Sequence, residues 1–189
     1  MGWHHIFEML TAARTVYDEF KNLCVWTKTN GGMGSLYRSQ YELVGVFKKG
    51  SAAHINNIEL GRHGRYRTNV WAYAGMNSFG AERDEALAMH PTVKPVALVK
   101  DAILDCSNRN GIVLDAFMGS GTTLIAAQRV GRRCFGLEIE PRFVDVTLRR
   151  FHTLTGIEPL HVDSGLTLAE LQRARQSGAS ASGNSTDRE

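Results

Sequence analysis

Hydrophobic residues in the first 50 positions follow first a helical and then an extended pattern. From residue 1 to 20 they recur at helical spacing, which predicts an amphipathic helix that begins almost at the amino terminus and ends at 21–22. Two short apolar runs, at 23–26 and 43–47, predict buried strands, and a glycine-rich segment at 31–34 lies between them. These two strands can pair as an antiparallel hairpin with a long loop.

Periodicity fades between about 48 and 89, where glycine and asparagine become frequent, and we expect an irregular insert there. At the other end of the chain, the residues from about 177 to 189 are serine, glycine, alanine and charged residues without large apolar side chains. Such a composition cannot bury enough apolar surface to offset the entropy of ordering, so we expect a disordered tail.

Between these two segments the pattern becomes regular and alternates helices with strands. The predicted elements, in order, are a helix from Pro95 to Leu104, a strand at 112–117, a glycine turn at 119–121, a helix at 122–130, a strand at 134–138 and a helix that begins at Pro141. This alternation is typical of an α/β fold in which helices cover a parallel sheet. We therefore expect one α/β domain over 1–155, including the insert at 48–89, and an extension over 156–189.

Composition narrows the class of protein only a little. The 189 residues are 43% hydrophobic and 22% charged, as in an ordinary globular domain, and the net charge of +3 is compatible with nucleic-acid binding without establishing it. Without a long apolar run or a signal-peptide pattern, a cytoplasmic location is expected. The three cysteines lack the spacing of a zinc site, so we expect buried free thiols and no metal.

The glycine turn after the strand at 112–117 is the first feature that suggests chemistry. Glycines between a strand and a helix let a ligand approach the backbone N–H groups at the helix start. The segment lacks the lysine of a phosphate-binding P-loop, and Leu124 occupies the third glycine position of the dinucleotide fingerprint. Glu138, at the end of the next strand, is placed to accept ribose hydroxyls. A nucleoside that carries a carboxylate rather than a pyrophosphate fits both features.

Three segments closely resemble the DNA adenine-N6 and cytosine-N4 methyltransferase family in its circularly permuted branch. They are His90-Pro91-Thr92-Val93-Lys94-Pro95, the segment at 114–123 and the segment at 136–140, and the resemblance extends over roughly residues 3–155. It implies a Rossmann-like methyltransferase fold, incomplete at the amino terminus, with an antiparallel hairpin and an irregular insert. It also implies S-adenosyl-L-methionine as cofactor and double-stranded DNA as partner. Ala116 departs from the proline usual at that position.

The resemblance carries a set of cofactor-binding residues with it. Glu138 would accept the ribose hydroxyls, Asp115 would lie near the ammonium or sulfonium charge, and Lys94 would supply a cation at the methionine end. Two alternatives remain open, since Asp115 can simply cap the following turn and Glu138 can be a solvated carboxylate. The full set is Thr92, Lys94, Pro95, Asp115, Phe117, Gly119, Ser120, Gly121, Thr122, Thr123 and Glu138.

Candidate DNA contacts lie upstream of the cofactor motifs. Segment 22–28 with its following tyrosines looks like the paired strands of the family, and the arginine cluster at 62–67 falls where relatives hold much of their target-recognition segment. Basic residues interleaved with aromatics suit phosphate contact, although a solvated basic loop is the alternative. The predicted DNA-binding residues are Tyr37, Arg38, Arg62, Arg65 and Arg67.

The sequence lacks the motif with which this family holds the target amine, Asp/Asn/Ser-Pro-Pro followed by an aromatic residue. The four prolines stand apart from one another, so the motif is absent. A substitute remains an open alternative for which we can name no residue. The resemblance places residues 1–5 inside a family domain, with two strands expected upstream, between the strand at 112–117 and the hairpin. We therefore expect a gap in the sheet, with exposed apolar edges.

Three functions compete on these observations. The favoured one is a site-specific DNA methyltransferase, acting on adenine N6 or cytosine N4, of which this chain is a truncated or split form that is inactive alone. A second is a non-catalytic DNA-binding or regulatory subunit. In either case an amino-terminal fragment or partner chain would complete the sheet. The third and least favoured is a small-molecule methyltransferase or a nucleotide-binding oxidoreductase of the same topology.

Overall fold

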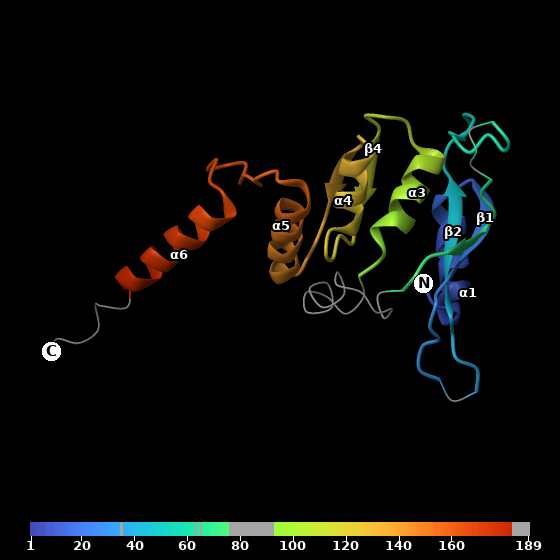
Figure 1. Cartoon of the computed structure of the whole chain (residues 1–189), viewed down its shortest axis with the longest axis horizontal. Helices are drawn as coiled ribbons and strands as arrows, with labels where there is room; N and C mark the ends of the chain where they lie inside the picture. Colours follow the sequence, from blue (N-terminus) through green and yellow to red (C-terminus); the bar gives the residue numbers. More distant parts are fainter. Residues whose placement is uncertain (35, 63, 65, 76–92, 183–189) are drawn as a thin grey trace.

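The computed structural model describes residues 1–34, 36–62, 64, 66–75 and 93–182 (Figure 1). A short 3-10 helix, η1 (Trp3–His5), leads into helix α1 (Ile6–Val16). Strands β1 (Glu19–Thr27) and β2 (Tyr41–Lys48) then form the predicted antiparallel hairpin, with Cys24 opposite Val44. On its other edge β1 pairs in parallel with β3 (Val70–Ala72), which gives the order β2-β1-β3.

Two features of this part differ from the sequence prediction, the end of helix α1 and the presence of strand β3. Helix α1 ends at Val16, whereas the apolar pattern predicts a helix to residue 20. Phe20 belongs to β1 because its ring stacks on Phe47 of β2, at 5.0 Å between centroids, so its apolar side chain is matched across the hairpin. Strand β3 lies inside the predicted irregular insert, and three residues are too few to show a period-two pattern.

The second part follows the predicted alternation of helices and strands. Helix α3 (Val96–Cys106) precedes strand β4 (Ile112–Asp115), helix α4 (Thr122–Arg129), strand β5 (Arg133–Gly136) and helix α5 (Pro141–Thr155). Strands β4 and β5 are parallel, and Ile103, Ala126 and Ala127 form a buried cluster between α3 and α4. Val113 and Cys134 pack against that cluster, so the helices cover one face of the two strands.

The other face of the β4–β5 pair is not covered by the described residues. Ile112, Leu114, Phe135 and Leu137, which we call the open face, are large apolar side chains that are exposed to solvent. Within the described part of the chain the strands form two separate sheets, and α3 stands between them in Figure 1. This arrangement agrees with the expected gap between the two groups of strands.

Beyond α5 the chain forms helix α6 (Leu168–Ser182), which extends away from the rest of the structure (Figure 1). Helix α6 overlaps the first six residues of the segment at 177–189 for which we expect disorder, and that expectation stays a prediction. Residues 183–189 lie outside the described residues, and the division into domains stays a prediction.

Two simpler expectations can be compared with the structure directly. Cys24 is buried as expected, whereas Cys106 is exposed at the end of α3, so burial of all three thiols was wrong. None of the helices in the described ranges combines the length and the apolar character needed to cross a bilayer.

Candidate functional site

The turn between β4 and α4 depends on two glycines in left-handed conformations. Gly119 has φ of 54° and Gly121 has φ of 77°, a region that other residues enter only with strain. Gly121 is the N-cap of α4, and its N–H donates to the carbonyl of Met118 at 3.0 Å. A Cβ on Gly121 would lie 2.6 Å from Cγ2 of Thr147, so backbone conformation and close packing both require glycine here.

Side chains of helix α5 hold this glycine turn through hydrogen bonds to its carbonyl groups. Thr147 is buried, and its hydroxyl donates to the carbonyl of Gly119 at 2.8 Å. One turn later, Nη1 of Arg150 donates to the carbonyl of Ser120 and to the hydroxyl of Thr122, both at 3.0 Å. Sequence reasoning missed both residues, because a threonine and an arginine on one face of an amphipathic helix are not distinctive.

Glu138, the predicted ribose acceptor, lies where strand β5 meets the glycine turn. Its Oε2 accepts the N–H of Gly119 at 2.7 Å, and its Oε1 accepts the N–H of Glu140 at 3.0 Å. The carboxylate is thus fixed by backbone donors on both sides and remains partly exposed. The structure brings Glu138 and the glycine turn together, as the motifs predict.

Asp115 caps the turn that follows β4, which was the alternative role considered for it from the sequence. Its Oδ1 accepts the N–H of Phe117 at 3.0 Å, which caps the turn after β4. Phe117 itself is 90% exposed, and Ile139, beyond the end of β5, is 97% exposed. Because β4 and β5 are adjacent and parallel, two uncovered apolar side chains stand at one sheet edge, on either side of Glu138 in chain order.

Lys94 and Pro95 connect this edge to the hairpin sheet. The hydroxyl of Thr122 donates to the carbonyl of Lys94 at 3.4 Å, and Pro95 is the N-cap of α3. The ammonium group of Lys94 lies 3.0 Å from Oε2 of Glu42 in β2. Two motifs that are 28 residues apart in the chain therefore meet. Thr92 lies outside the described residues.

Glu42 is shared between two lysines at the root of the hairpin loop. Its Oε1 accepts a hydrogen bond from Lys28 at 2.6 Å, and the amino group of Met1 lies 3.6 Å from Oε2. Burial alone raises the pKa of Glu42, but the hydrogen bonds from Lys28 and Lys94 together outweigh it and hold that pKa below its ordinary value of 4.5. The group is therefore a carboxylate at neutral pH.

The predicted DNA-binding residues fall in different surroundings. Tyr37 and Arg38 are exposed on the loop between β1 and β2, and Arg62 is exposed and pairs with Glu59 at 3.1 Å. Arg67 does not face solvent as the prediction requires. Its guanidinium points at helix α3, a contact that the sequence did not predict. Arg65 lies outside the described residues.

Arg67 forms the centre of a polar contact between the insert and α3. Its Nε lies 2.7 Å from Oδ2 of Asp105, and the two side chains are only 15% and 11% exposed. This is an ion pair without an aligned N–H, because Nε has no acceptor in hydrogen-bond geometry among the described residues. Its Nη1 donates to the hydroxyl of Tyr73 at 3.0 Å, and that hydroxyl donates to Asp101 at 2.5 Å. Arg67 thus positions the insert.

Sequence comparison finds DNA methyltransferases. The profile of the DNA methylase family matches residues 1–149. The type II methyltransferase M2.MboI of Moraxella bovis is 27% identical over 165 residues, which are 82% of this chain and 59% of that protein. The type II methyltransferase M.ScaI of Streptomyces caespitosus is 36% identical over 88 residues, which are 46% of this chain and 29% of that protein. The chain thus spans less than two thirds of the length of these relatives.

Solved structures show the same fold. The crystal structure of the M1.HpyAVI–SAM complex matches with a TM-score of 0.64 and 26% identity, over 79% of this chain and 71% of that one. The cytosine-N4-specific PvuII DNA methyltransferase matches with a TM-score of 0.62 and 20% identity, over 77% of this chain and 56% of that one. At that lower identity the likeness concerns the fold alone. The predicted methyltransferase fold is confirmed.

Proposed function

Because the chain belongs to the DNA adenine-N6/cytosine-N4 methyltransferase family, we propose that it binds S-adenosyl-L-methionine where β4 and β5 end and contributes to methylation of DNA. The observation that carries this proposal is the junction of the glycine turn with Glu138, in which the carboxylate of Glu138 accepts the N–H of Gly119 at 2.7 Å. A carboxylate beside a glycine turn suits a nucleoside with ribose hydroxyls. M1.HpyAVI, a structural neighbour, was solved as a complex with this cofactor.

Each residue around that junction is proposed to bind a different part of the cofactor. Glu138 accepts ribose hydroxyls. The exposed ring of Phe117 and the exposed side chain of Ile139 pack on the adenine. The N-terminus of α4 at Thr122 and Thr123, with its free N–H groups, faces the methionine carboxylate. Gly119, Ser120 and Gly121 line the cofactor through their backbone, and Asp115 keeps that turn in place. On this proposal Lys94 and Pro95 close the methionine end together with Thr92.

Methyl transfer itself needs groups for which this sequence offers no recognisable motif. An exocyclic amine becomes a nucleophile when hydrogen-bond acceptors hold it close to the methyl group, after the base has left the stack. The sequence has no Asp/Asn/Ser-Pro-Pro-aromatic motif to do so. We therefore propose that an additional polypeptide segment or partner chain supplies these groups and covers the open face of β4 and β5. Double-stranded DNA, a cytoplasmic location and inactivity of the chain alone belong to the same proposal.

A second function is favoured by that same missing motif. A subunit that keeps the fold and binds DNA without catalysing methylation needs Tyr37, Arg38 and Arg62 but no amine-holding residues. The two functions predict different chemistry when this chain is combined with the segment or partner chain that would supply the missing groups. Methyl transfer to DNA by the combined proteins supports the first function, and cofactor-independent DNA binding alone supports the second.

Calorimetry with S-adenosyl-L-methionine tests the proposed cofactor site. Replacing Glu138 with glutamine removes a charged acceptor, which is worth roughly 1.5–3 kcal/mol for a hydrogen bond to a charged group, so affinity is expected to fall at least about tenfold. The matched control Glu158→Gln removes an exposed carboxylate from the segment after α5, where it pairs with His152, and leaves affinity unchanged. Absence of cofactor binding by the folded wild-type chain would rule out the proposal.

A further inference from the structure

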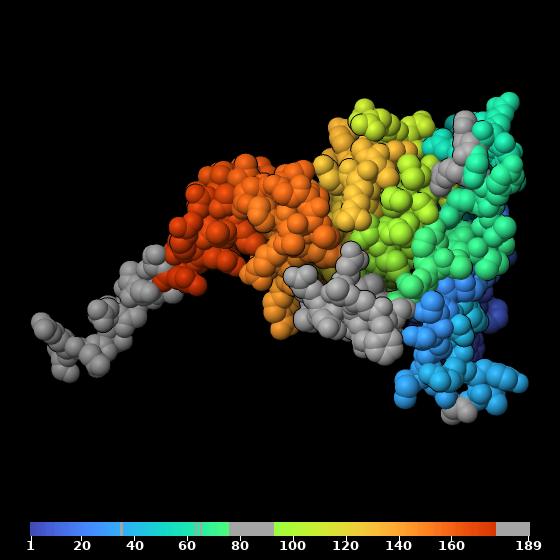
Figure 2. All heavy atoms as spheres, in the orientation of Figure 1, coloured from blue at the N-terminus to red at the C-terminus, as the bar shows by residue number. Residues whose placement is uncertain are grey.

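The loop between β1 and β2, residues 28–40, carries large apolar side chains that nothing in the described structure covers. At its tip Met33 is 97% exposed, Leu36 is 84% exposed and Tyr37 is 87% exposed. One exposed apolar side chain is ordinary on a protein surface, but three on one loop tip form a patch that marks an interaction surface. In Figure 2 this blue loop protrudes from the lower end of the molecule.

Hydrogen bonds within the loop hold its backbone in a defined shape. The guanidinium of Arg38 donates from Nε to the carbonyl of Gly32 at 2.9 Å and from Nη2 to the carbonyl of Gly31 at 3.0 Å. The N–H of Gly32 donates to the carbonyl of Ser39 at 2.8 Å, and the amide of Gln40 donates to the carbonyl of Lys28 at 2.8 Å. The apolar side chains are therefore presented by a preorganised loop, which lowers the entropy lost on binding.

The charge around this loop selects the kind of partner. Residues 28–41 include two basic residues, Lys28 and Arg38, and no acidic one. At the root of the loop, Lys28 and Lys94 lie 4.8 Å and 5.6 Å from the ring centroid of Trp26 and share the carboxylate of Glu42. A cationic root with an apolar tip matches a nucleic acid, which offers anionic phosphates outside and apolar base faces inside.

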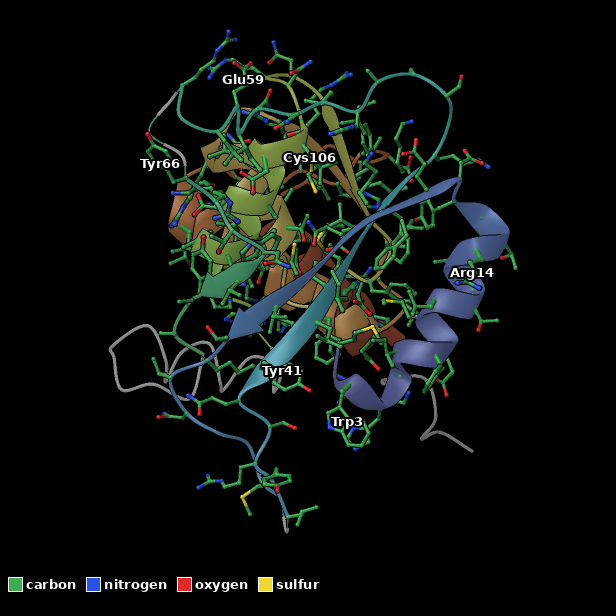
Figure 3. The ribbon with its side chains drawn as sticks, turned by 90° about the vertical axis from the view of Figure 1, so that its right-hand side faces the viewer. Trp3, Arg14, Tyr41, Glu59, Tyr66 and Cys106 are labelled. Atoms are coloured by element: carbon green, nitrogen blue, oxygen red, sulfur yellow. The ribbon has the colours of Figure 1, made fainter. Side chains whose placement is uncertain are left out.

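The position of the loop relative to the cofactor site fits the same partner. Figure 1 shows the loop projecting on the side of the molecule where α3 and α5 begin, and the sheet edge with Glu138 lies there because α5 follows β5 directly. In Figure 3 the ribbon continues beyond Tyr41 into the loop, and side chains spread outward at its far end. Lys94 contacts Glu42 at the loop root, and its carbonyl accepts the hydroxyl of Thr122, the first residue of α4 after the glycine turn. A duplex at the cofactor edge would therefore meet the loop.

We infer that the loop at 28–40 inserts into a DNA duplex beside the target base, with Tyr37 stacked on an exposed base face. Met33 and Leu36 pack in the same opening, and Lys28 and Arg38 contact the flanking phosphates. Proteins that insert apolar side chains between base steps unstack them, and removal of a base for chemistry requires such an opening. This inference rests on the proposed DNA partner and adds the element that opens the duplex.

Fluorescence anisotropy with two labelled duplexes of the same sequence, one intact and one with an abasic site, tests the insertion. Because the abasic duplex does not have to be unstacked, the full chain is expected to bind it at least about fivefold more tightly. Tyr37→Ala is expected to weaken binding to the abasic duplex at least about fivefold, the low end of the effect of losing a stacked aromatic residue. Tyr37→Phe retains the ring and is expected to retain that affinity.

A paired set of double variants separates insertion from general surface effects. Met33→Ser with Leu36→Ser is expected to remove the preference for the abasic duplex. The control pair Leu160→Ser with Val162→Ser changes two exposed apolar side chains beyond α5 and is expected to leave it intact. Salt-dependent binding without an abasic preference, or a preference that Tyr37→Ala leaves unchanged, overturns insertion but not the DNA partner. A folded chain that binds neither duplex overturns both, and calorimetry with S-adenosyl-L-methionine decides the cofactor site separately. Binding of the wild-type chain to anionic lipid vesicles with no duplex binding would assign the loop to membranes and likewise overturn insertion.

Discussion

At the residue scale, Gly121 shows how one position serves both backbone conformation and packing. It takes φ of 77° as the N-cap of α4, and Thr147 of α5 packs against the place where a side chain would begin. Thr147 also fixes the carbonyl of Gly119 in the same turn. The geometry of the glycine turn is therefore set jointly by its own sequence and by a helix that follows the next strand.

Replacement of Gly121 with alanine is predicted to destabilise the fold more than its backbone angle alone requires. A left-handed non-glycine residue costs about 1–2 kcal/mol, and forcing a methyl group into a packed site costs a further 1–3 kcal/mol, roughly. Urea denaturation followed by circular dichroism measures the loss. The control is Gly156→Ala at the end of α5, where φ is 70° but no atom lies within 4 Å of the added Cβ. Equal losses for the two variants would contradict the packing role of Thr147.

What the sequence predicts about the site depends on whether the interacting residues are near one another in a motif. Gly119, Gly121 and Glu138 can be assigned because their order and spacing are distinctive, and their contacts join neighbouring strands. Arg150 reaches Ser120 and Thr122 across 30 and 28 positions of sequence, and no local pattern indicates that contact. Arg67 was assigned to DNA from its basic neighbours, whereas its ion pair with Asp105 depends on how the insert folds back onto α3.

At the element scale, the described part of the insert contacts α3 at the middle and at the carboxyl end of that helix. Near the carboxyl end, the amide of Asn57 donates to the carbonyls of Leu104 and Ser107 at 3.0 Å and 2.7 Å, which satisfies carbonyl groups that the helix leaves free. Nearer its middle, Tyr73 and Arg67 contact the acidic face of α3. The described part of the insert, whose one strand in these residues is β3, is thus held against the helix that precedes the proposed cofactor site.

Arg67→Met is predicted to destabilise the protein by about 2–3 kcal/mol, because it removes the guanidinium that lies 2.7 Å from the largely buried carboxylate of Asp105. Thermal or urea unfolding measures this loss. Adding Asp105→Asn to the same chain removes the carboxylate charge of that ion pair and is expected to recover part of the stability. The matched control, Arg62→Met, breaks an exposed pair with Glu59 and costs under about 0.5 kcal/mol. Similar losses for the two arginine variants would show that Arg67 is not a structural residue.

Element boundaries were predicted where apolar patterns are long and failed where two elements share a pattern. The helices at 96–106, 122–129 and 141–155 were found from proline and glycine signals at their ends. The boundary between α1 and β1 was placed too late, since Phe20 satisfies a helical period and a strand pairing equally well. Strand β3 needs the neighbouring edge of β1 to exist, and that edge is not visible in a local sequence window.

At the scale of the whole molecule, the structure consists of a hairpin sheet and a two-stranded parallel sheet on opposite sides of α3. Parallel strands are usually covered by helices on both faces, whereas the open face of β4 and β5 is exposed in this chain. The overall class, α/β with a methyltransferase fold, was predictable because it follows from the order of motifs. How the two sheets are spaced was expected only through family resemblance, since no residue pattern specifies it.

The open face is predicted to make the isolated chain self-associate at micromolar concentrations. Leu114→Ser with Phe135→Ser, which changes two side chains that are register partners on this face, is expected to weaken association at least about tenfold. The reason is that covering each such side chain in an interface contributes roughly 1.5 kcal/mol or more. Size-exclusion chromatography with light scattering measures the association. Phe7→Ser removes one exposed aromatic from α1 and serves as the control. A wild-type chain that stays monomeric, or a double variant that associates like it, would contradict this.

The hold of α5 on the glycine turn has a consequence for the order in which the protein is made. A ribosome releases β4, the glycine turn and α4 well before Thr147 and Arg150, which hold the carbonyls of Gly119 and Ser120. During translation the nascent turn therefore exists for some time without these contacts, and its carbonyls are satisfied by water. The proposed cofactor site is complete only when α5 has emerged and docked. A ligand that binds only the completed site is therefore expected to bind only chains whose synthesis has passed residue 150.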